Sequence, residues 1–253
     1  MGRKKRYTEE EEQEIYESII SQQNNHTLKT SKIDLKYKNE NQKKLAESIE
    51  KKEVTICSGP AGTGKTFIAC AQALKLFKND LRYKRIYIVK SVTTLRDEEI
   101  GFLKGTLEEK MEPYVFSFIH NFEKLVGRGT VQTLRANKSI EVMPIAFLRG
   151  INFDDCIVLI DEAQNITPEN MHTIMTRLGS NCKMVFLGDV KQKDLTGNKV
   201  SSLPIIMQKF DNREEFGVVS FSEDDIVRNP LIRLIEEIFD EVSEELKQKK
   251  KQS

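Results

Sequence analysis

The chain has 253 residues, enough to bury the core of one α/β domain but too few for two large domains. Lysine and arginine number 40 against 39 aspartates and glutamates, so overall charge does not indicate a nucleic-acid-binding protein, and any such site must be a local patch. The four cysteines form no C-x-x-C pair, the three histidines are scattered, and no segment has the ~18 apolar residues of a membrane span, so we expect a soluble, cytoplasmic protein with reduced, mostly buried cysteines.

Both ends of the chain are polar. Residues 1–35 combine a basic cluster, an acidic stretch and the run SQQNNHT, and we interpret them as a polar arm with at most a short amphipathic helix. Residues 241–253 end in KQKKKQS, a basic tail that is either a solvated helix end or a contact for nucleic acid. Residues 36–240 are then expected to form the main domain.

Short β-rich runs alternate with helical stretches through this domain. In chain order they are EVTICSG, the helical KTFIACAQALKLF, then RIYIVKS, SIEVMP, CIVLIDEAQ, CKMVFLGD and FGVVSFS. The unbroken apolar run Ile157 to Ile160 is typical of a strand buried on both faces, which favours an α/β fold with a parallel sheet flanked by helices. The stretch from Gly101 to Gly150 contains a long helical segment and is expected to be an inserted helical and loop region over the sheet.

The run GPAGTGKT marks a phosphate-binding loop. Gly59, Gly64, Lys65 and Thr66 match G-x-x-x-x-G-K-[ST], and the loop lies between a predicted strand and a predicted helix, as the motif requires. We expect Lys65 to reach the outer phosphates and the Thr66 hydroxyl to bind Mg²⁺. The expected nucleotide contacts are Gly59, Pro60, Ala61, Gly62, Thr63, Gly64, Lys65, Thr66 and Phe67.

Two carboxylates follow the strand CIVLI. Asp161 is predicted to hold Mg²⁺ through water, and Glu162 to orient or deprotonate an attacking water. Because a kinase must exclude water, a water-activating carboxylate favours an ATPase over a kinase. The alternative is that the Asp-Glu pair only caps the next helix.

Two glutamines are further candidates. Gln192 follows the strand KMVFLGD and could sense the γ-phosphate or the water, although GDVKQKD could equally be a polar turn. Gln42 carries an amide that could read adenine, and no N-K-x-D run for reading guanine is present, but one residue does not exclude GTP. Asn39 or Asn41 capping a helix is the alternative for this segment.

Read together, these motifs resemble the PhoH family of ATP-binding proteins, which are similar to the superfamily 1 helicase core. The likeness runs from about Lys36 to Ile238, and its most specific block spans Val158 to Leu195. The other blocks are NQKKLAESI, SGPAGTGKTFIA, GFLKGTLEEKMEPY, IEVMPIAFLRG and DDIVRNPLI.

The resemblance implies a RecA-like P-loop NTPase domain with Mg·ATP in the loop, commonly assembled as a homo-oligomeric ring, with a hexamer favoured. It puts Gln42 at the adenine-reading position, Gln192 at the third-motif glutamine and Arg228 at the arginine of VRNP. Such an arginine could neutralise charge on the γ-phosphate, in its own chain or in a neighbouring subunit. Lys65, Glu162, Gln192 and Arg228 are therefore the expected catalytic residues, and Thr66 and Asp161 the expected metal ligands.

Two departures from the family pattern affect substrate contacts. The family has Arg-Pro after the second strand where this chain has VKSVTT, and its MRGR is here LRGI, with Ile151 in place of the second arginine. The short N-terminal arm leaves no room for the nuclease domain of some relatives, so no intrinsic nuclease activity is expected.

The leading hypothesis is an ATPase coupled to single-stranded RNA or DNA, with helicase or translocase activity possible. A nucleotide-dependent switch or assembly protein is the alternative, and an AAA-type loader is disfavoured because no adequate helical lid follows. Basic residues between Gly101 and Gly150 could meet nucleic-acid phosphates, or could be merely solvated. They are Lys104, Lys110, Arg128, Arg135, Lys138 and Arg149.

Overall fold

The structure is a computed structural model. It describes residues 8, 28, 31–91, 107–148, 150–192, 195 and 200–227, together with residues 231, 234, 235, 238, 239, 241 and 242. Among the candidate site residues named above, Lys104, Arg149 and Arg228 lie outside this part of the chain.

Six parallel strands form one sheet, in the order β3-β2-β4-β5-β1-β6. The predicted α/β class with a RecA-like parallel sheet is therefore confirmed, and each predicted strand is present. Their bounds are β1 (Val54–Ser58), β2 (Arg85–Lys90), β3 (Ile140–Pro144), β4 (Cys156–Asp161), β5 (Cys182–Gly188) and β6 (Phe216–Ser220). All residues of β1 and β5 are buried, as expected for strands covered on both faces.

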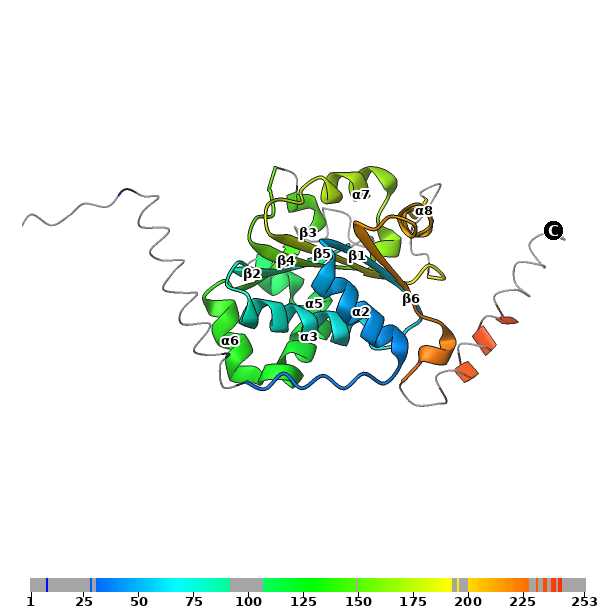
Figure 1. The fold of residues 1–253 in the computed structure, drawn as a ribbon, viewed down its shortest axis with the longest axis horizontal. Helices are drawn as coiled ribbons and strands as arrows, with labels where there is room; N and C mark the ends of the chain where they lie inside the picture. Colours follow the sequence, from blue (N-terminus) through cyan, green and yellow to red (C-terminus); the bar gives the residue numbers. More distant parts are fainter. Residues whose placement is uncertain are drawn as a thin grey trace, which may run out of the picture.

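Helices cover both faces of the sheet (Figure 1). One face carries α2 (Glu40–Lys51), α3 (Lys65–Asn79), α5 (Leu107–Val126) and α6 (Arg128–Ala136); the other carries α7 (Pro168–Met175) and α8 (Leu203–Phe210). The described residues also contain three short 3-10 turns: η1 (Ile145–Leu148), η2 (Ala163–Asn165) and η3 (Glu223–Asp225). Each face has its own apolar core.

The inserted region between β2 and β3 is part of the helical layer. Phe118 and Phe122 of α5 are fully buried in the core that α3 shares, so one face of this helix packs into the fold, while Phe116 on another face is exposed. The long apolar side chains on one face of α5 explain why it forms there.

The strand order brings three strand ends together. Because all strands are parallel, the loops after β1, β5 and β4 leave the same edge of the sheet, and β5 lies between the other two.

The four cysteines are buried and none is in a disulfide, in agreement with the reduced, mostly buried cysteines expected from the sequence. Within the described residues, no helix combines the length and apolar character needed to cross a membrane.

Candidate nucleotide-binding site

The phosphate loop turns sharply between β1 and α3. Gly64 has φ +85° and caps α3, a conformation that glycine adopts without strain. At Gly59, an added Cβ would lie 2.4 Å from the Cβ of Phe221, so the loop passes directly against the chain that follows β6. The N-terminus of α3, with its free N–H groups, therefore faces the inside of the loop.

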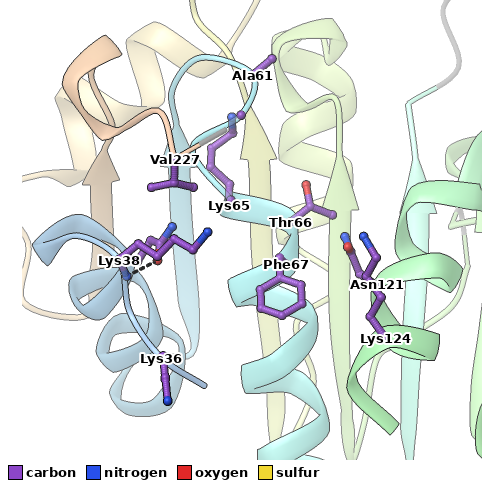
Figure 2. A pocket seen from close by; sticks show the side chains of 12 residues that line it. Lys36, Lys38, Ala61, Lys65, Thr66, Phe67, Asn121, Lys124 and Val227 are labelled. Carbon is purple, nitrogen blue, oxygen red and sulfur yellow. Dashed lines mark hydrogen bonds between the residues drawn. The ribbon is translucent and has the colours of Figure 1, made fainter. Parts of the chain in front are cut away.

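Lys65 folds back into this loop. Its Nζ donates hydrogen bonds to the carbonyl oxygens of Gly59 (2.5 Å) and Pro60 (2.9 Å), and Figure 2 shows the side chain directed into the turn. Burial lowers the pKa of the Lys65 ammonium, while nearby acidic groups, including Asp189 and Asp161, oppose the shift. A bound anion would stabilise this buried cation and take over from the two carbonyls.

Gln42 holds the loop from the side of α2. Its Nε2 donates to the carbonyl oxygen of Thr63 (2.8 Å), its Oε1 accepts from the backbone N–H of Lys38 (2.8 Å), and its side chain is almost fully buried. Asn39 caps α2 by accepting from the N–H of Gln42, so the capping alternative is correct for Asn39. Adenine reading by Gln42 stays a prediction.

Asp161 ends β4 and meets a lysine that sequence reasoning missed. Lys90 ends β2 in register with Asp161, and its Nζ lies 3.0 Å from Asp161 Oδ2 and 3.6 Å from Glu162 Oε1. Burial raises the pKa of Asp161 even though Lys90 pulls it down. Burial by itself lowers the pKa of Lys90, but Asp161 and Glu162 together raise it above its ordinary value.

Glu162 lies at a strained turn just after β4. Its φ of 53° is in the left-handed region, which a non-glycine residue occupies at some cost in free energy. It precedes η2 but makes no side-chain capping bond, which disfavours the alternative that the Asp-Glu pair only caps a helix. Its carboxylate instead contacts Lys90 and Gln164 at the edge of the sheet.

Gln164 links the ends of β4 and β5. Its Nε2 donates to Glu162 Oε2 (2.7 Å), its Oε1 accepts from the N–H of Asp189 (3.1 Å), and it is 1% exposed. The amide thus orients Glu162 from behind, a role that sequence reasoning did not assign although the quoted run DEAQ contains this residue. Gln192 follows in a turn closed by its N–H on the Asp189 carbonyl, with an exposed side chain.

The chain after β6 also contacts the loop. The N–H of Val227 donates to the Gly62 carbonyl (3.1 Å), and Asp225 accepts from Asn41 of α2 (2.8 Å). Arg228, outside the described residues, is the next residue along the chain from Val227.

A cavity of about 520 Å³ opens beside the phosphate loop (Figure 2). Such a volume suits a small-molecule ligand. Four of the lining residues are lysines and none is acidic, which favours an anionic ligand. The lining residues are Ala61, Gly62, Gly64, Lys65, Thr66 and Phe67 of the loop and α3, Lys36, Lys38 and Gln42 near α2, Asn121 and Lys124 of α5, and Val227.

The family model described as PhoH-like protein matches residues 34–240, which is most of the chain and includes every residue of this site. The chain belongs to the PhoH-like family. It is a P-loop NTPase homologue, and the phosphate loop of that class implies nucleotide binding.

Curated PhoH-like relatives match over much of the chain. The PhoH-like protein of Bacillus subtilis is 32% identical over 229 residues, 90% of this chain and 70% of the relative. Protein PhoH of Escherichia coli is 35% identical over 197 residues, 77% of this chain and 55% of the relative. The PhoH-like protein of Synechocystis is 32% identical, and the match spans 60% of its length. The chain thus spans little more than half of several longer relatives.

A solved structure of the large terminase from a thermophilic bacteriophage is also similar in part. The match covers 75% of this chain and 46% of the terminase, with 11% identity and a TM-score of 0.47.

Proposed function

We propose that this PhoH-like chain is a Mg²⁺-dependent ATPase whose activity is coupled to single-stranded RNA or DNA. The observation that supports it best is the meeting of three parts at one sheet edge. The phosphate loop, the pair Asp161 and Glu162, and the turn after β5 leave neighbouring strand ends, and Gln164 ties the last two together. A carboxylate held in this way can orient or deprotonate an attacking water, which favours hydrolysis.

The roles follow from the positions. Lys65 is at the loop that would hold the β- and γ-phosphates, and Glu162 is the base or orienting group for the attacking water. Gln192 would sense the γ-phosphate from the turn after β5. Arg228 would neutralise developing charge, in cis or in trans.

The donor set fits Mg²⁺. The Thr66 hydroxyl lines the cavity, and the Asp161 carboxylate at the end of β4 is the kind of hard oxygen ligand that this ion prefers. When bound, Mg²⁺ would neutralise phosphate charge. Lys90 provides the positive charge beside Asp161 in the structure described here.

Coupling to nucleic acid and assembly as a ring, with a hexamer favoured, belong to the same proposal. Coupling to nucleic acid is supported by the exposed Arg128 and Lys138 around α6, although Arg128 also lies 4.0 Å from Glu123. Assembly is supported by a set of exposed apolar residues between 231 and 242. An ATP-dependent switch that assembles partners without moving nucleic acid is the alternative.

The test is steady-state ATP hydrolysis by the full chain, with and without single-stranded RNA and DNA, at two salt concentrations. We expect hydrolysis to be stimulated several-fold by at least one nucleic acid, and the stimulation to fall at higher salt because phosphate contacts are screened. Equal rates under all conditions would contradict the coupling and favour the switch. No hydrolysis under any condition would contradict the ATPase itself.

A further inference from the structure

Lys90 is a buried cation that the register of β2 and β4 places beside two carboxylates. It ends β2 directly opposite Asp161, which ends β4. Its Nζ donates to Asp161 Oδ2 at 3.0 Å and lies 3.6 Å from Glu162 Oε1. The side chains of Lys90 and Asp161 are 18% and 14% exposed, so water screens these charges little.

The two carboxylates have no second counter-ion among the residues that the structure describes. In this part of the chain, Lys90 is the only lysine, arginine or histidine with a nitrogen within 4 Å of Asp161 or Glu162. Lys65 of the phosphate loop donates to the carbonyl oxygens of Gly59 and Pro60 instead. Lys90 lies in the run VKSVTT, in which this chain departs from the family pattern.

A divalent cation at Asp161 would meet the ammonium group of Lys90. One oxygen of this proposed metal ligand already accepts from Lys90, and a dication on either carboxylate would lie close to a buried positive charge. Two cations repel strongly where water screens them little. Because the ammonium already offsets part of the carboxylate charge, a dication alone gains little by binding here.

A bound triphosphate would change this balance. Lys65 and Thr66 line the cavity in which we propose that the nucleotide binds, so its phosphates would add negative charge at this edge of the sheet. Phosphate oxygens are also ligands in their own right, and protein-bound Mg²⁺ is usually held by one or two carboxylates together with phosphates. The added negative charge would offset the repulsion from Lys90.

We propose that Lys90 excludes divalent cations from the nucleotide-free site, so that Mg²⁺ is held there only together with the nucleotide. Lys90 is a positioning residue in this role, because it acts through Asp161 and Glu162. The inference rests on the proposed Mg²⁺ and ATP site and adds to it the residue that makes metal binding depend on the nucleotide.

The test measures equilibrium binding of Mn²⁺ to the full chain by calorimetry, since carboxylate oxygens suit Mn²⁺ as well as Mg²⁺. Without nucleotide, Lys90→Gln should bind Mn²⁺ at least roughly tenfold more tightly than wild type, because it keeps an N–H donor for Asp161 but removes the charge. Mn²⁺ should accordingly raise the melting temperature of Lys90→Gln more than that of wild type. Lys90→Arg keeps the charge and should bind Mn²⁺ as weakly as wild type.

Two further variants locate the effect. Adding Asp161→Asn to Lys90→Gln should abolish the gain, because it removes the carboxylate that Lys90 contacts. Lys84→Gln is the matched control: Lys84 forms an ion pair with Asp155 at 3.2 Å, at the opposite ends of β2 and β4. It should leave the affinity for Mn²⁺ unchanged.

Wild type also tests the inference without any variant. A non-hydrolysable ATP analogue at saturating concentration should tighten Mn²⁺ binding to wild type by at least roughly tenfold, beyond the binding of Mn²⁺ to the analogue in solution. Nucleotide-free wild type that binds Mn²⁺ as tightly as the analogue-loaded protein would overturn the inference.

The remaining outcomes separate this inference from the function on which it rests. Folded Lys90→Gln with the wild-type affinity for Mn²⁺, or a gain that survives Asp161→Asn, would overturn the role of Lys90 while leaving the ATP site intact. Wild type that does not bind the ATP analogue, titrated separately, would overturn both.

Discussion

Lys90 is the side chain on which the charge balance of the site depends. It lies between Asp161 and Glu162 at the sheet edge and is itself mostly buried, 18% exposed, so its charge is screened little by water. Removing it would leave two carboxylates adjacent to each other without a described cation within 4 Å, at a turn that Glu162 already strains. The site therefore depends on a residue that no phosphate-binding motif names.

We predict that Lys90→Met lowers the free energy of unfolding by about 2 kcal/mol at neutral pH, because a buried charged hydrogen bond is lost and its partner stays behind. Lys90→Arg should keep most of the wild-type stability, since it retains the positive charge. Urea denaturation without nucleotide or Mg²⁺ measures the free energy of unfolding of both variants. Wild-type stability of Lys90→Met would show that the ion pair contributes nothing.

The loss of stability caused by Lys90→Met should depend on pH in a defined direction. Burial raises the pKa of Asp161 and Lys90 lowers it, so the variant should have a still higher pKa at this carboxyl. A carboxyl whose pKa is raised in the folded state lowers the free energy of unfolding as the pH rises above its unfolded-state pKa. It has no such effect at low pH, where it is protonated in both states. The stability gap between wild type and Lys90→Met should therefore narrow as the pH falls from about 7 to about 4.

At the scale of elements, the approach of the phosphate loop to the end of β6 is the tightest constraint. A methyl group on Gly59 would meet the Phe221 Cβ at 2.4 Å and its carbonyl oxygen at 2.9 Å, and the backbone at Phe221 cannot rotate away as a flexible side chain could. The close approach of Gly59 to Phe221 thus fixes the position of the phosphate loop relative to the end of β6.

We predict that Gly59→Ala lowers the free energy of unfolding by about 2 kcal/mol through overpacking and weakens nucleotide binding by at least roughly tenfold through displacement of the loop. Gly129→Ala is the matched control, because Gly129 lies within α6 and an added Cβ there meets no atom within 4 Å. Gly129→Ala should leave the free energy of unfolding unchanged or raise it by up to about 1 kcal/mol. Thermal denaturation and nucleotide titration test the pair, and wild-type binding by Gly59→Ala would contradict the loop geometry.

The strands and loops also show which parts of the fold the sequence pattern can predict. The runs VTICS, CIVLID and CKMVFLG predicted β1, β4 and β5 correctly, because strands buried on both faces are continuous apolar segments. The residues of the phosphate loop could be predicted because this loop is a local sequence motif. Lys90 and Gln164 were missed because their contacts depend on strand order and register. Lys90 and Asp161, for example, are 71 residues apart in the chain.

At the scale of the whole molecule, exposed apolar residues near the C-terminal end bear on assembly. Leu234, Ile235, Ile238, Phe239 and Val242 are each at least 44% exposed, and their spacing puts them on one face of a helix. An apolar face of this kind is typical of an interface between subunits. It supports the proposed homo-oligomeric ring.

We predict that Ile238→Asp combined with Phe239→Asp shifts the ATP-loaded protein from an oligomer to a species near 29.2 kDa, measured by light scattering. Ile205→Asp, which changes a similarly exposed side chain on α8, should leave the oligomer intact. Wild type that stays at the mass of one chain at every concentration would contradict the ring and the in-trans role of Arg228.

The most direct test of the central claim compares ATP turnover and nucleotide binding in wild type and Glu162→Gln. Glutamine keeps the size of the side chain but cannot accept a proton from water, so we expect turnover to fall by roughly a hundredfold or more while the dissociation constant for Mg·ATP changes by less than about threefold. Turnover equal to wild type in a variant that still binds Mg·ATP would contradict the assignment of this edge of the sheet as the site of hydrolysis.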